Sequence, residues 1–465
     1  MIGSIVANLQ NIFVFVVFLS VLIIVHEWGH FITAKRLGIE VQRFALGFGP
    51  TIFSKVYEGT RYMINAIPLG GYVKMAGDER AEYQGKPGEF LSKPAGHRAL
   101  VVLNGPVVNF ILAYLSFVIV FMIGYPGHST TITKINEGGP AAAAGLRVGD
   151  KIIGVDARKI YGLLNLDARL EGDRAAPATV TVVRKGEVIG FTVNPEIVDK
   201  PNLVGRLRKV RDFGIDTFPI DENLANVIGG LEPAFPAKKA GLVAGDRIVE
   251  IDGKKITDWQ SLQSAVETSA GEQIRIKIIR DGQELIKSVT PKIVTAQNES
   301  GQNMQVRRIG ISPKQEITLD LFRFGFIDSL VFAGEELWFI TGLTYEALYR
   351  LVIGAAKAEE SVAGPIGIFY IVKGAAESGI SHLLFVLGVI SASLAIFNLL
   401  PVIPLDGGHL FLLGIEKVRG RALSPKADEY VARVGFSLII LLALFIFYVD
   451  FVRWGWFDYI GNLFG

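Results

Sequence analysis

The chain has 465 residues, half of them hydrophobic, with a mean hydropathy of +0.40 and a formal net charge of only +2. This nearly balanced charge excludes the strongly basic surface of a typical nucleic-acid-binding protein. The absence of cysteine excludes disulfides and thiolate ligands, which leaves histidine, aspartate and glutamate to bind a metal ion. Four stretches approach the roughly 20 apolar residues that cross a bilayer, which predicts a multi-pass α-helical membrane protein.

The first predicted span, about residues 6–34, contains His26-Glu27-Trp28-Gly29-His30. On a helix, His26 and His30 share one face, so their imidazoles can bind one ion, and Glu27 beside them can move a proton. This pattern on a helix is typical of a zinc metallopeptidase with two histidine ligands and a glutamate base. Ionisable groups in a membrane span usually serve a function. A pair of buried, hydrogen-bonded histidines without a ligand is the alternative.

Residues 41–75 predict a β-region, with short strands at 52–57 and 61–66 around the turn Glu58-Gly59-Thr60. Strand backbone at membrane depth is tolerated only where it is buried in protein or lines a wet cavity. We therefore expect a membrane-embedded β-hairpin, to which a substrate could add as a further strand along residues 61–66 or 70–73. A hairpin on the cytosolic surface is the alternative.

The second predicted span, about residues 100–125, begins with polar and helix-perturbing residues. Asn104, Gly105, Pro106 and Asn109 lie near its start, where they could face the first span. Ordinary packing by small residues explains them equally well. Residues 1–126 therefore form the first membrane half.

The next part of the chain has the hydropathy of a soluble protein and contains an internal repeat. The segment at residues 145–156 matches that at 241–252 at a constant offset of 96, which predicts two copies of one mixed α/β domain, at 127–220 and 221–313. The pattern resembles PDZ domains of bacterial proteases. Such domains can bind an extended peptide at a sheet edge; a spacer or steric gate without a specific peptide is the alternative.

Residues 314–380 predict amphipathic helices on the membrane surface or against the helix bundle. The second membrane half, 381–465, has spans at about 381–400 and 434–448. Lys and Arg gather between the first two spans and between the last two, so the positive-inside rule places both loops in the cytoplasm. Both termini and the repeated domains are then extracytoplasmic, and the metal motif lies near the cytoplasmic side.

A catalytic zinc typically has three protein ligands. In this topology, the cytoplasmic end of the first span can face that of the third, which leads into Asp406. His409 follows three residues later and is the competing candidate. The other histidines lie farther away in this topology and are not expected to bind: His97, His128 and His382.

Three features together resemble the bacterial site-2 proteases, which are zinc intramembrane metalloproteases with tandem PDZ domains. They are the motif at 26–30, the paired domains, and Asn398-Leu399-Leu400-Pro401 leading to Leu405-Asp406-Gly407. The resemblance implies that Zn²⁺ is bound by His26, His30 and Asp406, with Glu27 as the catalytic base. It further implies that other residues contact the substrate backbone or form β-structure beside the site: Asn398, Gly47, Phe48, Gly49, Gly70, Gly71 and Tyr72.

The resemblance also implies the substrates and the location. These would be transmembrane proteins such as anti-sigma factors or remnant signal peptides, cut within or near their membrane segment in the bacterial inner membrane, with the PDZ pair restricting access. Two other classes of protein are alternatives: a membrane adaptor with a vestigial metal site, and a metal transporter. Glu27 beside the candidate ligands disfavours both, because neither function needs a general base there.

Overall fold

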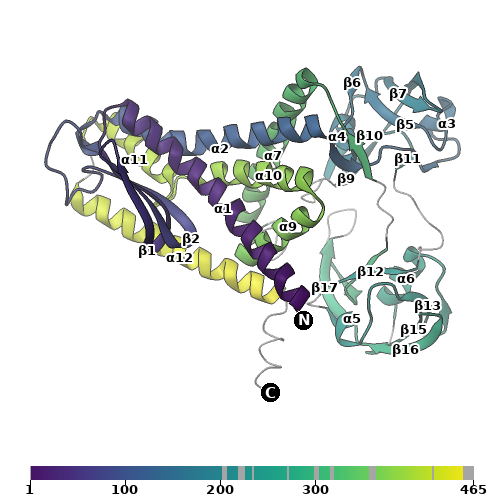
Figure 1. Cartoon of the computed structure of the whole chain (residues 1–465). Helices are drawn as coiled ribbons and strands as arrows, with labels where there is room; N and C mark the ends of the chain where they lie inside the picture. The colour runs from purple at the N-terminus through teal and green to yellow at the C-terminus, as the bar shows by residue number, and fades with distance from the viewer. Residues whose placement is uncertain are drawn as a thin grey trace. The chain divides into compact units, whose positions relative to one another are not determined.

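The computed structural model describes most of the chain: residues 2–201, 207–217, 226–232, 235–269, 272–297, 303–314, 319–354, 363–421 and 424–453. The described chain divides into two compact units (Figure 1). One comprises Met1–Pro126 and Leu321–Asp450, and the other is centred on Gly127–Asp320. The repeat seen in the sequence therefore lies within one unit, and both halves of the apolar sequence lie in the other.

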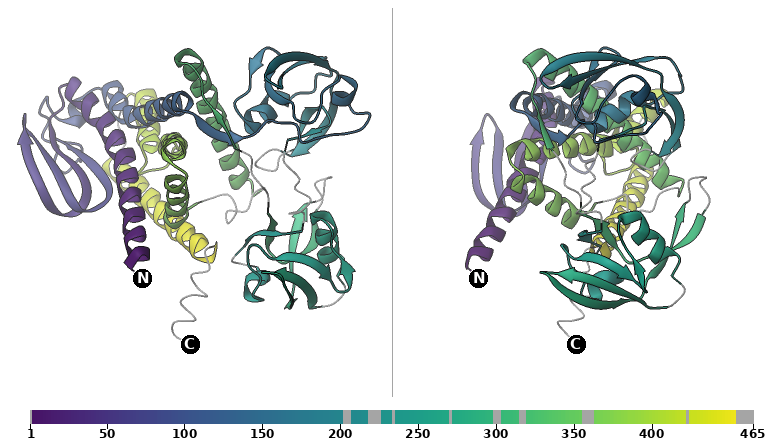
Figure 2. Two further views of the ribbon diagram at one scale, coloured as in Figure 1. Left: turned by 45° about the vertical axis from the view of Figure 1, so that its right-hand side comes forward. Right: turned by 90° about the vertical axis from the view of Figure 1, so that its right-hand side faces the viewer.

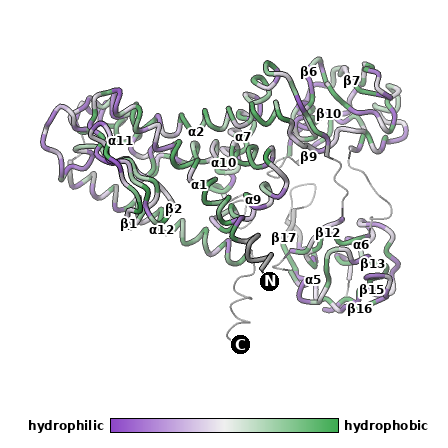
Figure 3. Tube along the Cα trace, viewed as in Figure 1, coloured by the Kyte–Doolittle hydropathy of each residue, from purple (hydrophilic) through white to green (hydrophobic). Residues whose placement is uncertain are grey.

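The first unit is built mainly of helices: α1 (Ile2–Arg36), α2 (Ala95–Ile123), α7 (Phe326–Val352), α9 (Pro365–Glu377), α10 (Ile380–Asn398), α11 (Asp406–Arg419) and α12 (Pro425–Arg453). In the described residues, four segments are long and apolar enough to cross a membrane: Leu9–Arg36, Ala95–Ile123, Ile380–Asn398 and Glu429–Val452. Figure 3 colours these helices mostly green, for hydrophobic residues. They agree with the four stretches expected from the sequence.

Helices α1 and α2 pack closely because small and polar residues meet at their crossing. A Cβ atom added at Gly29 would overlap the backbone of Asn104. The Asn104 amide donates hydrogen bonds to the Gly29 carbonyl at 2.9 Å and to the Thr33 hydroxyl at 2.7 Å. On the other side, the Ser391 hydroxyl of α10 donates to the Asn109 carbonyl of α2 at 2.8 Å. Helix α2 is thus held between the helices that carry the predicted site.

The predicted hairpin is present but larger than expected, with β1 (Val41–Tyr57) and β2 (Thr60–Met75). Glu58 and Gly59 form the two-residue turn, both with positive φ, as a type I′ turn requires. The strands exceed the predicted 52–57 and 61–66 because Gly47 and Gly49, with φ of +82° and +83°, bend β1 without breaking it. In Figure 2 the hairpin lies along α1.

The bend turns two long strands into four paired segments. Residues 43–46 pair with 71–74 on one side and with 61–64 on the other, while 61–64 also pair with 53–56. Segment 61–64 is therefore interior and has no free edge. The prediction that a substrate strand could add there is wrong. Segment 71–74 pairs within the hairpin with 43–46 alone.

The region predicted to form amphipathic helices, 314–380, contains α7 and α9, and α7 is one continuous helix. Its buried face includes Phe332, Ala333 and Glu336. The Tyr114 hydroxyl of α2 donates to the Leu330 carbonyl of α7 at 3.1 Å, which ties the two helices together. The large apolar side chains of its other face are exposed: Ile327, Val331, Trp338, Tyr345 and Val352. The apolar stripe therefore points away from the helix bundle.

The second unit contains two copies of one arrangement of strands and helices. The first copy comprises β4 (Lys134–Ile135), α3 (Pro140–Ala143), β5 (Lys151–Val155), β6 (Arg158–Lys159), α4 (Leu163–Leu170), β7 (Ala178–Arg184), β8 (Glu187–Val193), β9 (Glu196–Pro201), β10 (Leu207–Asp212) and β11 (Ile215–Asp216). The second comprises β12 (Ile228–Leu231), α5 (Pro236–Lys239), β13 (Arg247–Ile251), β14 (Lys254–Lys255), α6 (Trp259–Glu267), β15 (Ile274–Arg280), β16 (Gln283–Val289), β17 (Lys292–Gln297), β18 (Asn303–Arg308) and β19 (Ile311–Pro313). Each contains a four-stranded sheet, β6-β5-β7-β8 and β14-β13-β15-β16.

An arginine–aspartate pair recurs in both copies and explains the aspartate of the repeated motif. Arg184 donates to the buried Asp150 from Nε at 2.6 Å, and Arg280 does the same to Asp246. The second guanidinium nitrogen of each arginine also donates to a backbone carbonyl at the start of the motif. Each pair therefore joins the motif turn to the adjacent end of the neighbouring strand, β7 or β15.

Candidate metal centre

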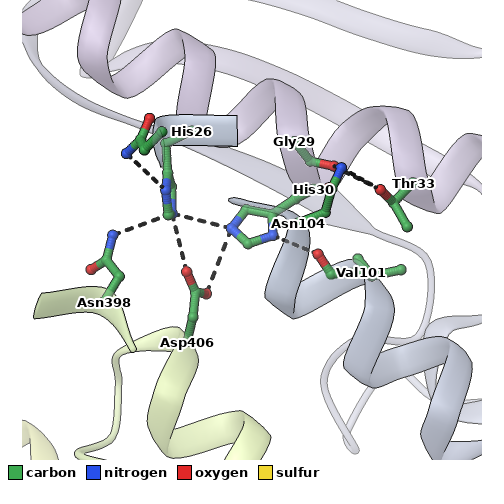
Figure 4. A network of polar contacts seen from close by, with 9 residues as sticks. His26, Gly29, His30, Thr33, Val101, Asn104, Asn398 and Asp406 are labelled. Atoms are coloured by element: carbon green, nitrogen blue, oxygen red, sulfur yellow. Dashed lines mark hydrogen bonds and ion pairs between the residues drawn. The ribbon is translucent and has the colours of Figure 1, made fainter. Parts of the chain in front are cut away.

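Two imidazoles converge near the C-terminal end of α1. His26 and His30 lie one helical turn apart, and their Nε2 atoms are 3.2 Å from each other (Figure 4). The ring planes are nearly perpendicular, and the short distance between the two Nε2 atoms brings both to one place. Both side chains are mostly buried, with 12% of each exposed. The helix alone therefore supplies two candidate ligands, as the spacing predicted.

The third group comes from the first residue of α11. Asp406 Oδ2 lies 3.2 Å from His26 Nε2, and its Oδ1 lies 3.5 Å from His30 Nε2. Gly407 allows this approach, because a Cβ there would overlap the carbonyls of Leu399 and Leu400. In the described part of the chain, the candidate metal group contains these three residues, whereas His409 is exposed and outside it. The remaining histidines lie outside the group too.

The donor atoms fit zinc. A tetrahedral zinc ion at about 2.0–2.1 Å from each ligand has ligand atoms about 3.3–3.4 Å apart. The three measured separations are 3.2, 3.2 and 3.5 Å. The Oδ2 atom of Asp406 is buried and makes no hydrogen bond, despite its short distance to His26. A buried carboxylate oxygen without a hydrogen bond, beside two imidazoles, fits the role of a metal ligand.

Further polar groups contact the candidate ligands His26 and His30. His30 Nδ1 lies 2.9 Å from the Val101 carbonyl, and His26 Nδ1 lies 3.4 Å from the Asn109 amide nitrogen. Asn398 reaches the same place from the end of α10, with Nδ2 at 3.5 Å from His26 Nε2. The sequence predicts that Asn109 could face the first span but does not predict its contact with His26, and a backbone carbonyl such as that of Val101 carries no signal that a sequence could show.

Glu27 faces the hairpin as well as the ligands. The backbone of Val73 hydrogen-bonds to its carboxylate, and a Cβ at Gly71 would lie 3.4 Å from Glu27 Cγ. The edge segment 71–74 of β2 is therefore beside the candidate base. The remaining predicted residues lie at the bend of the same hairpin. Gly47 and Gly49 shape the bend through their positive φ angles. Phe48 stacks on Tyr72, and a Cβ at Gly70 would overlap Phe48.

Comparison with known proteins gives one family and many relatives. The family model "Peptidase family M50" matches residues 14–442. The chain is 34% identical over 462 residues to the regulator of sigma-E protease RseP of Escherichia coli, covering 94% of this chain and 98% of the relative. It is 32% identical to protease RseP of Yersinia pestis, covering 96% and 99%. A Vibrio cholerae relative, provisionally named a zinc metalloprotease, is 30% identical, covering 96% and 99%.

Two solved structures of single domains each match about a fifth of the chain. The PDZ domain of an SdrC-like protein from Listeria monocytogenes is 22% identical, and the match covers 19% of this chain and 84% of that domain with a TM-score of 0.15. The corresponding domain from Listeria innocua is 25% identical, covering 20% and 98% with a TM-score of 0.16.

Proposed function

The chain belongs to peptidase family M50 and is a zinc metalloprotease, and we propose that it hydrolyses peptide bonds within or near the transmembrane segments of membrane proteins. The observation that carries this proposal is that Asp406, the first residue of α11, converges with His26 and His30, which lie on a helix apolar enough to span a membrane. A hydrolytic site on such a helix acts on substrates that lie in or at the bilayer.

We assign His26, His30 and Asp406 as the residues that hold zinc. When bound, the ion supplies Lewis acidity, which makes water more acidic and polarises a peptide carbonyl. Glu27 takes the proton of the attacking water and delivers it to the nitrogen of the leaving amine. The amide of Asn398 points into the same site and donates a hydrogen bond to the substrate backbone or to the oxyanion that forms on its carbonyl.

The hairpin can give the site access to the backbone of a helical substrate. A transmembrane helix hides each carbonyl in its own hydrogen bonds, and unpaired backbone in lipid costs several kcal/mol per group. The unwound substrate pairs with segment 71–74 of β2, which is an edge within the hairpin and lies beside Glu27. The hairpin also exposes large apolar side chains, which suit a position in the membrane: Phe48, Ile52, Phe53, Val56, Ile64 and Ile67.

We further propose that the two repeated copies are PDZ domains on the extracytoplasmic side of the membrane, opposite the proposed side of the metal motif. They restrict the entry of substrates. Substrates with bulky outer domains are excluded until an earlier cut trims them. The enzyme would reside in the bacterial inner membrane, with its termini extracytoplasmic. The Escherichia coli relative is named a regulator of sigma-E protease, and we propose anti-sigma factors as one substrate class and remnant signal peptides as a second.

The experiment uses purified full-length protein in detergent and a peptide that contains one transmembrane segment. Mass spectrometry of the products shows whether the cut falls within that segment. A chelator should abolish cleavage, and stoichiometric zinc should restore it. Cleavage confined to soluble peptides, with the transmembrane peptide left intact, would contradict an intramembrane substrate.

A further inference from the structure

One face of α2 is matched to the two histidines of α1. Val101, Gly105 and Asn109 follow one another at intervals of four residues, so they lie on one face of the helix. The Val101 carbonyl meets Nδ1 of His30, and the Asn109 amide meets Nδ1 of His26. Gly105 lies between them, where a Cβ would overlap atoms of both rings. This glycine lets α2 approach closely enough for both contacts.

The tautomer of each imidazole determines whether its Nδ1 atom donates or accepts in these contacts. The Nε2 atoms of both rings face the metal position, so each must keep a free lone pair there. A neutral imidazole then carries its proton on Nδ1, and that N–H needs an acceptor. For His30 the acceptor is the Val101 carbonyl at 2.9 Å. For His26 the neighbouring group is the Asn109 side chain at 3.4 Å.

The Asn109 amide can serve as this acceptor in one of its two orientations. With Nδ2 toward His26, two N–H groups face each other, and Oδ1 of the fully buried Asn109 makes no hydrogen bond. A half-turn about the last side-chain bond exchanges the two amide atoms in nearly the same space. The oxygen then accepts the Nδ1–H of His26, so one rotation removes both the donor–donor contact and the unpaired buried oxygen.

We propose that Asn109 is a positioning residue that accepts the Nδ1–H of His26 through Oδ1 and so directs Nε2 toward zinc. This inference rests on the zinc site assigned above. The bond fixes the tautomer and the ring orientation, and it makes Nε2 a stronger donor. The Ser391 hydroxyl, which donates to the backbone carbonyl of the same residue, contacts neither histidine in the described structure and serves as a matched control site.

The test measures zinc affinity, independently of proteolysis, by competition with a chromogenic chelator on the purified full-length protein. Asn109→Leu keeps the size of the side chain but removes the acceptor, so zinc should bind about 10- to 100-fold more weakly. Asn109→Asp keeps an acceptor and should stay within a few-fold of the unmodified protein. Ser391→Ala should bind zinc unchanged. Asn109→Ala takes the place of the leucine variant if that variant does not fold.

Each outcome decides a specific point. The inference is overturned if Asn109→Leu binds zinc as tightly as the unmodified protein while His26→Ala does not. It is also overturned if Asn109→Asp is as weak as Asn109→Leu, because the amide then acts by donation or packing. If His26→Ala itself holds zinc with unchanged affinity, the assigned zinc site is wrong and the role of Asn109 fails with it.

Discussion

Oδ2 of Asp406 lies 3.2 Å from Nε2 of His26, so the first and the last quarter of the chain meet at one point. His26 belongs to α1, and Asp406 begins α11 beyond the end of α10. The two membrane halves must therefore pack correctly before the site exists. Zinc binding should accordingly report on the assembly of the helical unit as well as on the ligands themselves.

Removing the carboxylate should weaken zinc binding more than removing any other group of α11. Asp406→Ala deletes one of three proposed ligands, and the loss should exceed the ~100-fold that an outer partner can contribute. The measurement is bound zinc per protein after dialysis against a weak chelator. His409→Ala is the control, because His409 is exposed and outside the group. Zinc lost from the His409 variant and kept by the Asp406 variant would exchange their assigned roles.

Gly105 should tolerate no side chain. A methyl group in Gly105→Ala would overlap both imidazoles, so α2 must shift away from α1. Overpacking of this kind typically costs about 1–3 kcal/mol, and here it should also weaken zinc binding. Thermal unfolding and zinc content measure the two effects. Gly96→Ala, on the same helix but with open space around it, should change neither. Equal behaviour of the two variants would show that the close approach of α2 is unimportant.

The paired aspartates predict loss of stability in acid. The Arg184 hydrogen bonds are the main cause that lowers the pKa of Asp150. At Asp246, burial raises the pKa, but the Arg280 and Val243 hydrogen bonds outweigh it, so the pKa is lowered. A carboxylate with a lowered folded pKa stabilises the fold above its unfolded pKa of about 3.9. That contribution is lost as the pH falls through the lower folded value.

Hydrogen exchange at β5 and β13, measured at decreasing pH, follows this loss in each of the two repeated copies separately. Arg184→Gln should destabilise the first copy by roughly 1–3 kcal/mol at neutral pH, because Asp150 is then buried without its partner. It should also weaken the dependence of that copy on acid, while the second copy stays unchanged. A uniform response of both copies would contradict independent aspartate–arginine pairs.

Strand addition predicts that one edge of the hairpin is sensitive to proline. Alternate residues of an edge strand direct their N–H groups outward, and proline removes such a donor. Proline placed in turn at residues 71–74 should reduce cleavage of a transmembrane peptide at the outward positions. The same scan along 53–56, the opposite edge, should leave cleavage unchanged where the variant folds. Equal cleavage throughout 71–74 would rule out substrate pairing at that edge.

The parts of the fold that follow from local periodicity were predictable. Helical spacing brings His26 and His30 together, and the sequence Glu58-Gly59 indicates a tight turn. Spacing alone leaves the choice between Asp406 and His409 open, because the path from Asn398 to α11 has no periodic pattern; the family resemblance is what favours Asp406. Its course depends on close backbone contacts at Gly407 and Gly408. The roles of the metal ligands and of the base remain predictions until variants are measured.

The arrangement of the hairpin was not predictable for a similar reason. Its central segment, 43–46, pairs on both sides only because β1 bends at Gly47 and Gly49. A glycine in a strand signals a bend or a bulge but does not say which distant segment it brings alongside. The same holds for α7, whose apolar stripe was visible in the sequence although its outward direction depends on packing against α2.

The central claim is that Glu27 moves protons at a zinc site formed by other residues. It is tested most directly by measuring both zinc affinity and transmembrane-peptide cleavage for Glu27→Gln. The account predicts zinc affinity within a few-fold of the unmodified protein and cleavage slower by about 10²–10⁴-fold. Cleavage at the unmodified rate with zinc fully bound would contradict it.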